Sequence, residues 1–347
     1  MTDLRTRFER LRETWLPSIL SLIEELVAES SAEESLLRNM MCYQLQTGGK
    51  RLRAILPLLV GEALDVDPAR LVPFGAACEM LHNASTVHDD IQDGDVARRG
   101  HPTIWNQFGM GQAVNLGDAM IAMTILLMQR LDAPVALRER ATCRLLQEML
   151  RVIEGQVEDL ELRGRATVSL PEYLHMVERK TSRLFALPLS GAALLCGAPE
   201  ELEAGLVEAA CHIGMLFQIQ DDILDIYGDK GRGEKGNDIR EGKRSFLVVH
   251  CMENAPPGDL TRLRQILDKA RGATTQEDVA ESQEIFERTG SLAFGLDELA
   301  RRRNAALSVR SLASYPALLE VLDEACGMFL APMASMLPAG LAARSAA

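Results

Sequence analysis

The stretch VHDDIQDGDVARRG, Val87–Gly100, is the part of the sequence from which the fold and the site are worked out. On a helix, Asp89 and Asp93 lie one turn apart on the same face with Asp90 adjacent, so three carboxylates form a compact group. Two such charges about 5 Å apart repel by roughly 3 kcal/mol at an effective dielectric constant of about 20. A divalent cation removes this repulsion. Oxygen ligands favour Mg²⁺, which commonly bridges a few carboxylates to the phosphate oxygens of a substrate.

The alternative interpretation of this stretch is a solvated acidic turn that ends at Gly94. A second copy of the spacing argues against that alternative. Asp221-Asp222-Ile223-Leu224-Asp225 also follows apolar residues at helical intervals. Two acidic faces opposed across one cavity would hold several Mg²⁺ ions and the diphosphate that these ions clamp.

Composition favours packed helices and excludes some classes of function. Apolar residues make up 47% of the 347 residues, which is ample for a core, and aromatic residues only 4%. Abundant Leu, Ala, Met and Glu suit helices better than sheets. Acidic residues outnumber basic ones by 50 to 37, giving a net charge of −13, so we expect no nucleic-acid partner.

Cysteine usage and hydropathy predict a soluble cytoplasmic protein. The seven cysteines form no Cys-x-x-Cys pair and sit mostly among apolar neighbours, which indicates buried free thiols in a reducing compartment. The first residues lack the pattern of a signal peptide. No uninterrupted apolar run reaches the roughly 18 residues that a membrane span needs, because Asp118 interrupts the longest candidate. We therefore expect no integral membrane segment.

Hydrophobic periodicity predicts helices along the whole chain and no strands or hairpins. The expected helices cover residues 4–26, 31–45, 54–64, 73–92, 117–131, 134–162, 170–195 and 202–227, with several more up to residue 330. Loops are expected at 94–103, 228–242 and 254–259, and the polar segment 271–288 indicates an exposed loop or a variable helix pair. The prediction is one all-α domain over residues 1–347, with 340–347 as a candidate disordered tail.

A glycine pair precedes a helix whose first turn is basic, in Gly48-Gly49-Lys50-Arg51-Leu52-Arg53. Positive charges at a helix start oppose the helix dipole. An anion bound by the backbone N–H groups, Lys50 and Arg53 would resolve this conflict. The alternative is a surface helix that follows a Gly-Gly turn.

The ordered set of motifs in this chain resembles the trans-type isoprenyl diphosphate synthases of the polyprenyl synthetase family, from about Gly48 to Ser245. The motifs are Gly48-Gly49-Lys50-Arg51-Leu52-Arg53, His82, Asp89-Asp90-x-x-Asp93 with Arg98-Arg99-Gly100, Gly117-Asp118, Gly155-Gln156-x-x-Asp159, Lys180-Thr181, Phe217-Gln218-x-x-Asp221-Asp222-x-x-Asp225, Gly236-Asn237-Asp238 and Glu241-Gly242-Lys243. Each motif alone is weak. The resemblance implies a bundle of antiparallel helices around a central cavity, the isoprenoid synthase type I fold, usually as a homodimer.

The resemblance also implies a reaction. An allylic diphosphate (dimethylallyl, geranyl or farnesyl diphosphate) ionises as Mg²⁺ and cationic side chains stabilise the departing diphosphate. The double bond of isopentenyl diphosphate attacks the allylic cation, and the released diphosphate can take the proton that is then lost. Three Mg²⁺ ions per active site are implied, two held by Asp89 and Asp93 and a third by Asp221, with Asp90 and Asp222 completing the catalytic clusters.

The remaining site residues are assigned by the same resemblance. Contacts to the allylic diphosphate would come from Arg98, Lys180 and Lys243, in a region completed by Gln156, Asp159, Thr181, Gln218, Asp222 and Asp238. Isopentenyl diphosphate would be bound by Lys50, Arg53, His82 and Arg99, with Gly49 leaving room for the backbone to approach it. His82 lies two helical turns before Asp89 on the same face. Its alternative role is that of a core histidine with satisfied hydrogen bonds.

The sequence departs from the family pattern at three places. Gly233 and Glu234 occupy the stretch where the family usually has a lysine, which leaves Lys235, Arg232 or Lys230 as substitutes. Trp105 stands where a histidine is common, and Ser245 replaces the usual threonine. The basic tail of some members is absent, with only Arg344 near the end.

Two other functions compete with prenyl transfer. A class I terpene cyclase also uses an Asp-rich motif and Mg²⁺, but it needs neither Lys50, Arg53 and Arg99 for a second diphosphate nor a second Asp-Asp-x-x-Asp. A non-catalytic prenyl synthase subunit would be expected to have lost Asp positions, and this chain keeps both clusters.

Product length is predicted from the helix before Asp89. Going toward its N-terminus, successive turns present Ser85 and Ala84, then Leu81, then Cys78 and Ala77, and nearly all of these are small. Members that stop at farnesyl usually carry aromatic residues there. Met120, Met123 and Met128 are candidates for a flexible floor, although each also suits ordinary core packing. We predict geranylgeranyl diphosphate as the product, with farnesyl or longer polyprenyl diphosphates as alternatives.

Overall fold

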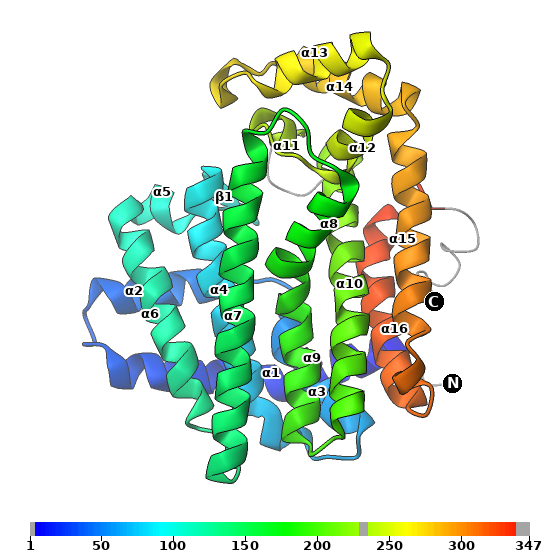
Figure 1. Cartoon of the computed structure of the whole chain (residues 1–347). Helices are drawn as coiled ribbons and strands as arrows, with labels where there is room; N and C mark the ends of the chain where they lie inside the picture. The colour runs from blue at the N-terminus through cyan, green and yellow to red at the C-terminus, as the bar shows by residue number, and fades with distance from the viewer. Residues whose placement is uncertain (1–3, 229–234, 338–347) are drawn as a thin grey trace. The chain divides into compact units, whose positions relative to one another are not determined.

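The computed structural model describes residues 4–228 and 235–337 (Figure 1). The chain is 79% helical with almost no strand, which confirms the all-α prediction. The candidate disordered tail lies outside the described residues, as do Lys230, Arg232, Gly233 and Glu234.

The chain divides into two compact units. The first contains residues 1–149, 184–207 and 310–321, and the second contains residues 150–183, 208–309 and 322–347. Helices α7 (Val135–Arg163), α10 (Glu200–Tyr227) and α16 (Pro316–Leu330) each have residues in both units. The single domain over residues 1–347 stays a prediction of the sequence.

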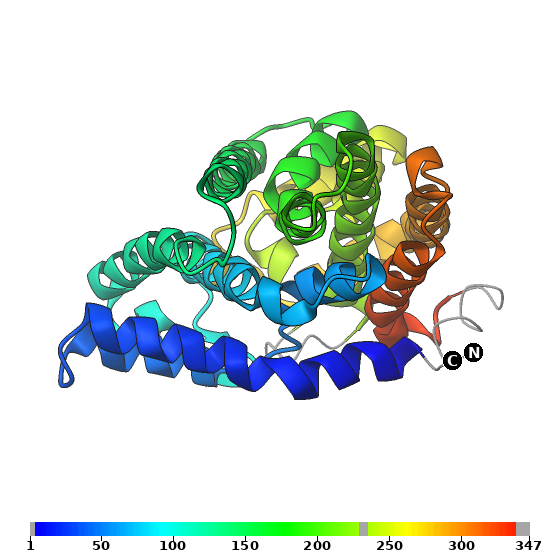
Figure 2. The same ribbon diagram turned by 90° about the horizontal axis from the view of Figure 1, so that it is seen from below.

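Helix α4 is the centre of the first unit, where it packs against α1, α3 and α6. A Cβ added at Gly75 of α4 would lie 2.4 Å from the Ala54 carbonyl oxygen, so this glycine lets α3 approach closely. Figure 2 shows α1 and α2 running alongside each other in this unit. The elements confined to this unit are α1 (Leu4–Ser30), α2 (Leu36–Gln46), α3 (Leu52–Ala63), η1 (Pro68–Leu71), α4 (Val72–Asp93), β1 (Ala97–Arg98), β2 (His101–Pro102), α5 (Ile104–Phe108), α6 (Met110–Met128) and η4 (Arg310–Leu312), and α9 (Arg183–Leu195) belongs to it from Leu184.

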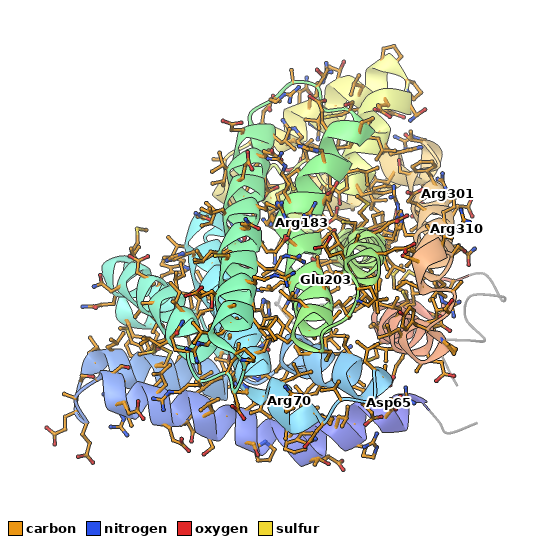
Figure 3. The ribbon with its side chains drawn as sticks, turned by 60° about the horizontal axis from the view of Figure 1, so that its bottom comes forward. Asp65, Arg70, Arg183, Glu203, Arg301 and Arg310 are labelled. Carbon is orange, nitrogen blue, oxygen red and sulfur yellow. The ribbon has the colours of Figure 1, made fainter. Side chains whose placement is uncertain are left out.

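Ion pairs and tight turns hold other parts of the first unit. Arg144 of α7 donates to the buried carboxylate of Glu203 on α10, with 3.0 Å between Nη2 and Oε2. Figure 3 labels Glu203, together with Asp65 and Arg70 from the connection between α3 and α4. Asp65 adopts a left-handed backbone there with φ of 57°.

The sequence predicted no hairpin, and this prediction is wrong at residues 97–102. Strands β1 and β2 pair antiparallel, with Arg98 opposite His101 and Ala97 opposite Pro102. The two turn residues, Arg99 and Gly100, have φ of 54° and 79°, as a type I′ turn requires. Strands of two residues are too short to show alternating hydropathy, and the turn lacks the usual Asn-Gly or Asp-Gly signal. This hairpin fixes the backbone positions from which the Arg98 and Arg99 side chains extend.

The second unit packs α12 against α8, α14 and α15, with α13 and α14 as an adjacent pair (yellow in Figure 1). The polar segment 271–288 therefore contributes to a helix pair instead of forming an exposed loop. The elements confined to this unit are α8 (Leu170–Val177), η2 (Glu178–Ser182), α11 (Asn237–Arg240), α12 (Phe246–Asn254), α13 (Pro257–Leu267), η3 (Arg271–Ala273), α14 (Gln276–Arg288), α15 (Ser291–Leu307) and η5 (Ala331–Met333).

The expected single helix at 170–195 is divided by the π-helical segment η2. A Cβ added at Gly155 of α7 would lie 2.2 Å from the backbone N of Lys180, and one at Gly214 of α10 would lie 2.4 Å from Cα of Ser182. Because both glycines lack a side chain, α7 and α10 close directly on the backbone of η2. This contact fixes the part of the chain that carries Lys180 and Thr181, and π-turns frequently occur at functional sites.

Helices α6 and α10 are long and apolar enough to cross a membrane by length and composition. The apolar window is 61% buried within the protein in α10 and 39% buried in α6, which packs along α4. Core helices of soluble proteins also have this length and composition, so these two helices are weak evidence for membrane spans.

All seven cysteines are free thiols, but only Cys78, Cys251 and Cys326 are buried. The expectation of buried thiols is wrong for Cys143, which is exposed on the outer side of α7. A single sequence shows the neighbours of Cys143 along the chain but not which face of its helix is covered.

We predict that Gly155→Ala destabilises the protein, although alanine is otherwise the better residue in a helix by about 1 kcal/mol. The added methyl group would overlap the backbone at Lys180, and overpacking of this kind costs about 1–3 kcal/mol. Gly164→Ala is the matched control, because nothing lies within 4 Å of the added Cβ. Urea unfolding of both variants measures the effect, and an unchanged midpoint for Gly155→Ala would contradict the close approach.

Candidate active site

The first acidic motif lies at the C-terminal end of α4, which ends at Asp93 with Gly94 as its C-cap (Figure 1). Asp89 is half-buried, whereas Asp90 is only 2% exposed. Oδ1 of Asp90 accepts a hydrogen bond of 2.6 Å from Nε of Arg98. Burial raises the pKa of Asp90 to about 6 even though Arg98 opposes the shift. Asp90 therefore orients Arg98 from inside the unit.

Arg98 is surrounded by carboxylates. Its Nη2 lies 3.6 Å from Oδ2 of Asp95 and 3.9 Å from Oδ2 of Asp89, in addition to the Asp90 bond. Charge-assisted contacts of this kind fix a guanidinium in one direction. The hairpin and Asp90 together place Arg98 beside Asp89.

A buried polar network, which sequence reasoning missed, fixes the start of α3. Arg51 has a left-handed backbone with φ of 54°, and its Nη1 lies 2.7 Å from Oε1 of Glu79. The Asn83 side chain donates to the same carboxylate oxygen and accepts from Gln44. The only signal in the sequence was an acidic residue inside an apolar stretch of α4. The network holds the turn from which exposed Lys50 projects.

Gly49 makes room for Arg99. The Arg99 guanidinium donates to the Gly48 carbonyl, and a Cβ at Gly49 would lie 2.6 Å from Nη1 of Arg99. Gly49 also has φ of 119°, a backbone conformation that residues with a Cβ rarely adopt. The space at this glycine is therefore occupied by a side chain of the protein itself.

Arg53 of α3 lies beside His82, which is two turns before Asp89 on α4. Nη1 of Arg53 lies 3.3 Å from Nε2 of His82, and the Arg53 guanidinium stacks 4.6 Å from the centre of the Phe185 ring. Burial lowers the pKa of Arg53 to about 10. Burial also lowers the pKa of His82, which Arg53, Arg99, Arg98 and Arg51 depress further, so the imidazole is neutral at pH 7.

Nδ1 of His82 is buried and accepts or donates no hydrogen bond within the described residues. An unpaired polar atom in a cationic setting costs free energy unless an anion or another polar group reaches it. The unpaired Nδ1 argues against the alternative role of His82 as a core histidine whose hydrogen bonds are all satisfied. The surroundings of His82 suit a phosphate group.

The residues proposed to set product length lie on different faces of α4. A helix turns by about 100° per residue, so Ser85 is about 40° from Asp89 and Ala84 about 140° away. Ser85 donates its hydroxyl to the His82 carbonyl at 2.9 Å, and Ala84 is fully buried. Leu81, Met120 and Met123 are also buried, the last two on α6. Ser85 is therefore the better probe of the Asp89 face.

In the second unit, Asp222 and Asp225 of the second motif accept hydrogen bonds from the protein. Asp222 accepts bonds from the Phe246 backbone N–H and the Tyr173 hydroxyl, both at 2.7 Å, and from Gln218 at 2.9 Å. Asp225 accepts from the backbone N–H of Asp238 at 3.0 Å.

These bonds give Asp222 and Asp225 structural tasks. Asp222 takes the place of a side-chain cap at the start of α12, since Ser245 makes none. Burial raises the pKa of Asp222 to about 7, and Asp238 adds to the rise. Asp221 is the half-buried member of the motif, and its role as a metal ligand stays a prediction.

The two lysines assigned to the allylic diphosphate are each held by carboxylates. Lys180 lies 2.8 Å from Oδ2 of Asp159, which also accepts from Arg163 at 3.0 Å. Burial would raise the pKa of Asp159, but Lys180, Lys243 and Arg163 outweigh burial and lower it. Lys243 lies 2.9 Å from Glu241 and 3.5 Å from Asp238.

Hydrogen bonds connect the π-helical segment to the acidic motif of the second unit. The Thr181 hydroxyl donates to Gln218, whose amide donates to Asp222. Gln156 is half-buried on α7, next to the glycine that contacts η2. Lys235 is exposed, between the undescribed segment and α11.

Sequence reasoning also missed Tyr173 and Arg244. Tyr173 is fully buried beneath Asp222. The Arg244 guanidinium donates to the carbonyls of Gly242 and Arg165, which ties the Lys243 segment to the end of α7. Tyr173 is the one aromatic residue of α8 and could have been suspected for its hydroxyl, whereas nothing local identified Arg244.

Over residues 4–228 and 235–337, no three His, Cys, Asp or Glu side chains converge into a preformed metal cage. Mg²⁺ usually keeps several waters and binds through one or two carboxylates plus substrate phosphates. Asp89, which is half-buried, and Asp93, which is 6% exposed, lie one turn apart on α4 and are the one or two carboxylates that such a site uses. The donor set therefore fits Mg²⁺ brought together with a diphosphate.

Comparisons with known proteins agree with this geometry. The model of the family described as polyprenyl synthetase matches residues 34–286. The chain is 39% identical to the geranylgeranyl pyrophosphate synthase of Geoglobus acetivorans over 233 residues, which are 67% of this chain and 72% of that protein. It is 34% identical to the short chain isoprenyl diphosphate synthase of Methanothermobacter thermautotrophicus over 275 residues, 78% of this chain and 83% of that protein.

Solved structures show the same fold. The structure of the geranylgeranyl pyrophosphate synthetase from Pyrococcus horikoshii is 29% identical, covers 93% of this chain and 97% of its own, and superposes with a TM-score of 0.83. The all-α isoprenoid synthase fold expected from the motifs is thereby confirmed. The chain therefore belongs to the polyprenyl synthetase family of trans-prenyltransferases.

Proposed function

We propose that the protein condenses isopentenyl diphosphate with an allylic diphosphate to give a longer all-trans prenyl diphosphate. The observation that carries this proposal is an acidic group at the end of α4 and an arginine–histidine pair near its middle. Asp89 and Asp93 form the acidic end, and His82 lies about 10 Å earlier on the same helix, seven residues at 1.5 Å each, where Arg53 of α3 contacts it. A separate anion site beside a metal site suits an enzyme that takes two diphosphates, whereas a terpene cyclase takes one.

The allylic diphosphate would be bound with Mg²⁺ at Asp89, Asp93 and Asp221. When bound, Mg²⁺ supplies charge that stabilises the departing diphosphate. Arg98, held by Asp90, and the lysines Lys180 and Lys243 would contribute preorganised positive charge to the same group. The proposal of three Mg²⁺ ions per active site rests on the family resemblance. A related polyprenyl synthase from Caulobacter crescentus was solved with calcium and isoprenyl diphosphate.

Isopentenyl diphosphate would be bound by Lys50, Arg53, Arg99 and the Nδ1 side of neutral His82. In the reaction the allylic C–O bond breaks, the isopentenyl double bond forms the new C–C bond, and a proton leaves the resulting cation. The released diphosphate is a base within reach of that proton, so no protein base is required. Lys235, which is exposed, remains the proposed substitute for the family lysine.

Geranylgeranyl diphosphate is the proposed product. Ser85 is the small side chain one turn before Asp89 on the same face of α4, which favours a chain longer than farnesyl, and relatives named geranylgeranyl diphosphate synthase are 31 to 39% identical to this chain. Farnesyl or longer polyprenyl products are the alternative outcomes, since relatives named farnesyl diphosphate synthase in Mycobacterium tuberculosis are 32% identical.

We also propose that the protein is a homodimer. Leu150, Ile153, Val157 and Leu160 of α7 are 61, 47, 51 and 37% exposed, and their spacing of three, four and three residues forms one apolar stripe. Such a stripe on a helix surface suits a second copy of the helix. Sedimentation equilibrium should find a dimer for the native chain and a monomer for Ile153→Asp. A native monomer at micromolar concentration would end this proposal.

A cytoplasmic location is the last part of the proposal. The seven free thiols are compatible with a reducing compartment. The soluble relatives of the family support the same assignment.

The Asp motifs give the first prediction for activity. Asp89→Ala and Asp221→Ala should each lower turnover by roughly a thousandfold, because each removes a group that stabilises developing charge. Asp297→Ala on the exposed side of α15 is the matched control and should keep full turnover. Circular dichroism should show an intact fold for Asp221→Ala and a destabilised one for Asp222→Ala, which loses the cap of α12. Near-normal rates for Asp89→Ala would refute the metal site.

Product length gives a second prediction. Ser85→Phe should fill the space on the Asp89 face and shorten the product to farnesyl or geranyl diphosphate, as measured by mass spectrometry. Ser85→Ala removes the hydroxyl without filling space and should leave the product unchanged. An active Ser85→Phe enzyme that makes the native product would show that the growing chain does not follow this face of α4.

A further inference from the structure

Helix α5 follows the β1–β2 hairpin directly (Figure 1). Trp105 lies on α5, and its indole bonds back to Asp95, just before β1. Nε1 of Trp105 donates a hydrogen bond of 2.8 Å to the Asp95 carbonyl. The Thr103 hydroxyl donates to the same oxygen at 2.7 Å. The Val96 carbonyl accepts from the Thr103 backbone N–H at 3.1 Å and from the Asn106 side chain at 3.0 Å. Four donors thus hold the two carbonyls that precede β1.

The hairpin needs such support because it is weak by itself. Each strand has two residues, and an isolated two-stranded hairpin is at best marginal in water. Its turn also places Arg99 in the left-handed region, which residues with a Cβ disfavour. The position of the hairpin must then come from contacts outside it.

The side chains on the hairpin depend on that position. Arg98 reaches Asp90 at 2.6 Å, and the Arg99 guanidinium fits into the space at Gly49. Each guanidinium is thus tied to a group outside the hairpin, Arg98 to Asp90 and Arg99 to the Gly48 carbonyl. A small shift of the strand that begins after Val96 would move both guanidinium groups.

We infer that Trp105 is a positioning residue whose indole N–H holds the Asp95 carbonyl and thereby aims Arg98 and Arg99. Its effect on diphosphate binding rests on the function proposed above, but the restraint on the hairpin does not. The indole N–H bonds to the Asp95 carbonyl, which is not assigned to metal or substrate, so we infer a role in position and not in the chemical step.

The N–H group can be separated from the bulk of the ring by two substitutions. The five-membered rings of tryptophan and histidine have the same arrangement, so Nε2–H of a histidine stands at the same distance from Cβ as Nε1–H of an indole. Trp105→His therefore keeps a donor at this place, whereas Trp105→Phe keeps an aromatic ring without a donor. Trp15 on α1 is the other tryptophan of the chain, and Trp15→Phe is the matched control.

Hydrogen exchange of the peptide covering residues 95–104 is the first measurement. Trp105→Phe should speed its exchange by roughly three- to tenfold, the range expected for the loss of one neutral hydrogen bond. Trp105→His and Trp15→Phe should match the native chain, and exchange within residues 135–149 should stay constant in all variants. Unchanged exchange in Trp105→Phe would overturn the inference, and so would a Trp105→His variant that exchanges as fast as Trp105→Phe.

Steady-state kinetics is the second measurement. Trp105→Phe should raise the KM for isopentenyl diphosphate by a similar factor, because Arg99 lies on the displaced hairpin, and Trp105→His should restore it. A native enzyme that elongates no allylic diphosphate would refute the proposed function, while the exchange data would still decide the positioning role.

A further variant covers the case in which Trp105→Phe does not fold. Thr103→Val removes the second donor to the same carbonyl and has nearly the same shape. It should also speed exchange at residues 95–104. Native exchange in this variant would show that the Asp95 carbonyl does not hold the hairpin and would overturn the inference.

Discussion

The bond between Asp90 and Arg98 is the interaction on which the first half of the site depends. A carboxylate buried at the end of α4 is stable only with a partner, and Arg98 provides it at 2.6 Å. The same bond turns the guanidinium toward Asp89. For this bond to form, the backbone at the start of the hairpin must be held in one position. The hydrogen bonds to the Asp95 carbonyl supply that restraint. Because Asp90 is buried with Arg98 as its partner, the Arg98 guanidinium is held beside Asp89.

The second unit uses the same principle with different partners. Asp222 is buried and receives three hydrogen bonds, from Tyr173, Gln218 and the first backbone N–H of α12. Through Gln218 it also reaches Thr181 on the π-helical segment, which glycines of α7 and α10 clamp on both sides. Asp221 is left as the more exposed acid of the motif. In each unit, the residue next to the proposed metal ligand is structural.

Sequence alone predicted the helices, the two acidic motifs and the cationic start of α3, because these depend on local spacing. It did not predict the Arg51–Glu79 pair, since 28 positions separate the two residues and one sequence does not reveal such contacts. The π-turn was missed because its cause lies in Gly155 and Gly214 on other helices. Sequence alone also did not predict that Asp90 is buried while Asp89 is half-buried. Adjacent residues on a helix point in different directions, and only packing decides which side chain is covered.

Product analysis of the purified protein tests the central claim most directly. The protein is incubated with isopentenyl diphosphate, Mg²⁺ and one allylic primer at a time, namely dimethylallyl, geranyl or farnesyl diphosphate, and the products are identified by mass. The account predicts Mg²⁺-dependent elongation of the primers to geranylgeranyl diphosphate. Conversion of a prenyl diphosphate into a cyclic hydrocarbon without isopentenyl diphosphate, or no elongation of any primer, would contradict it.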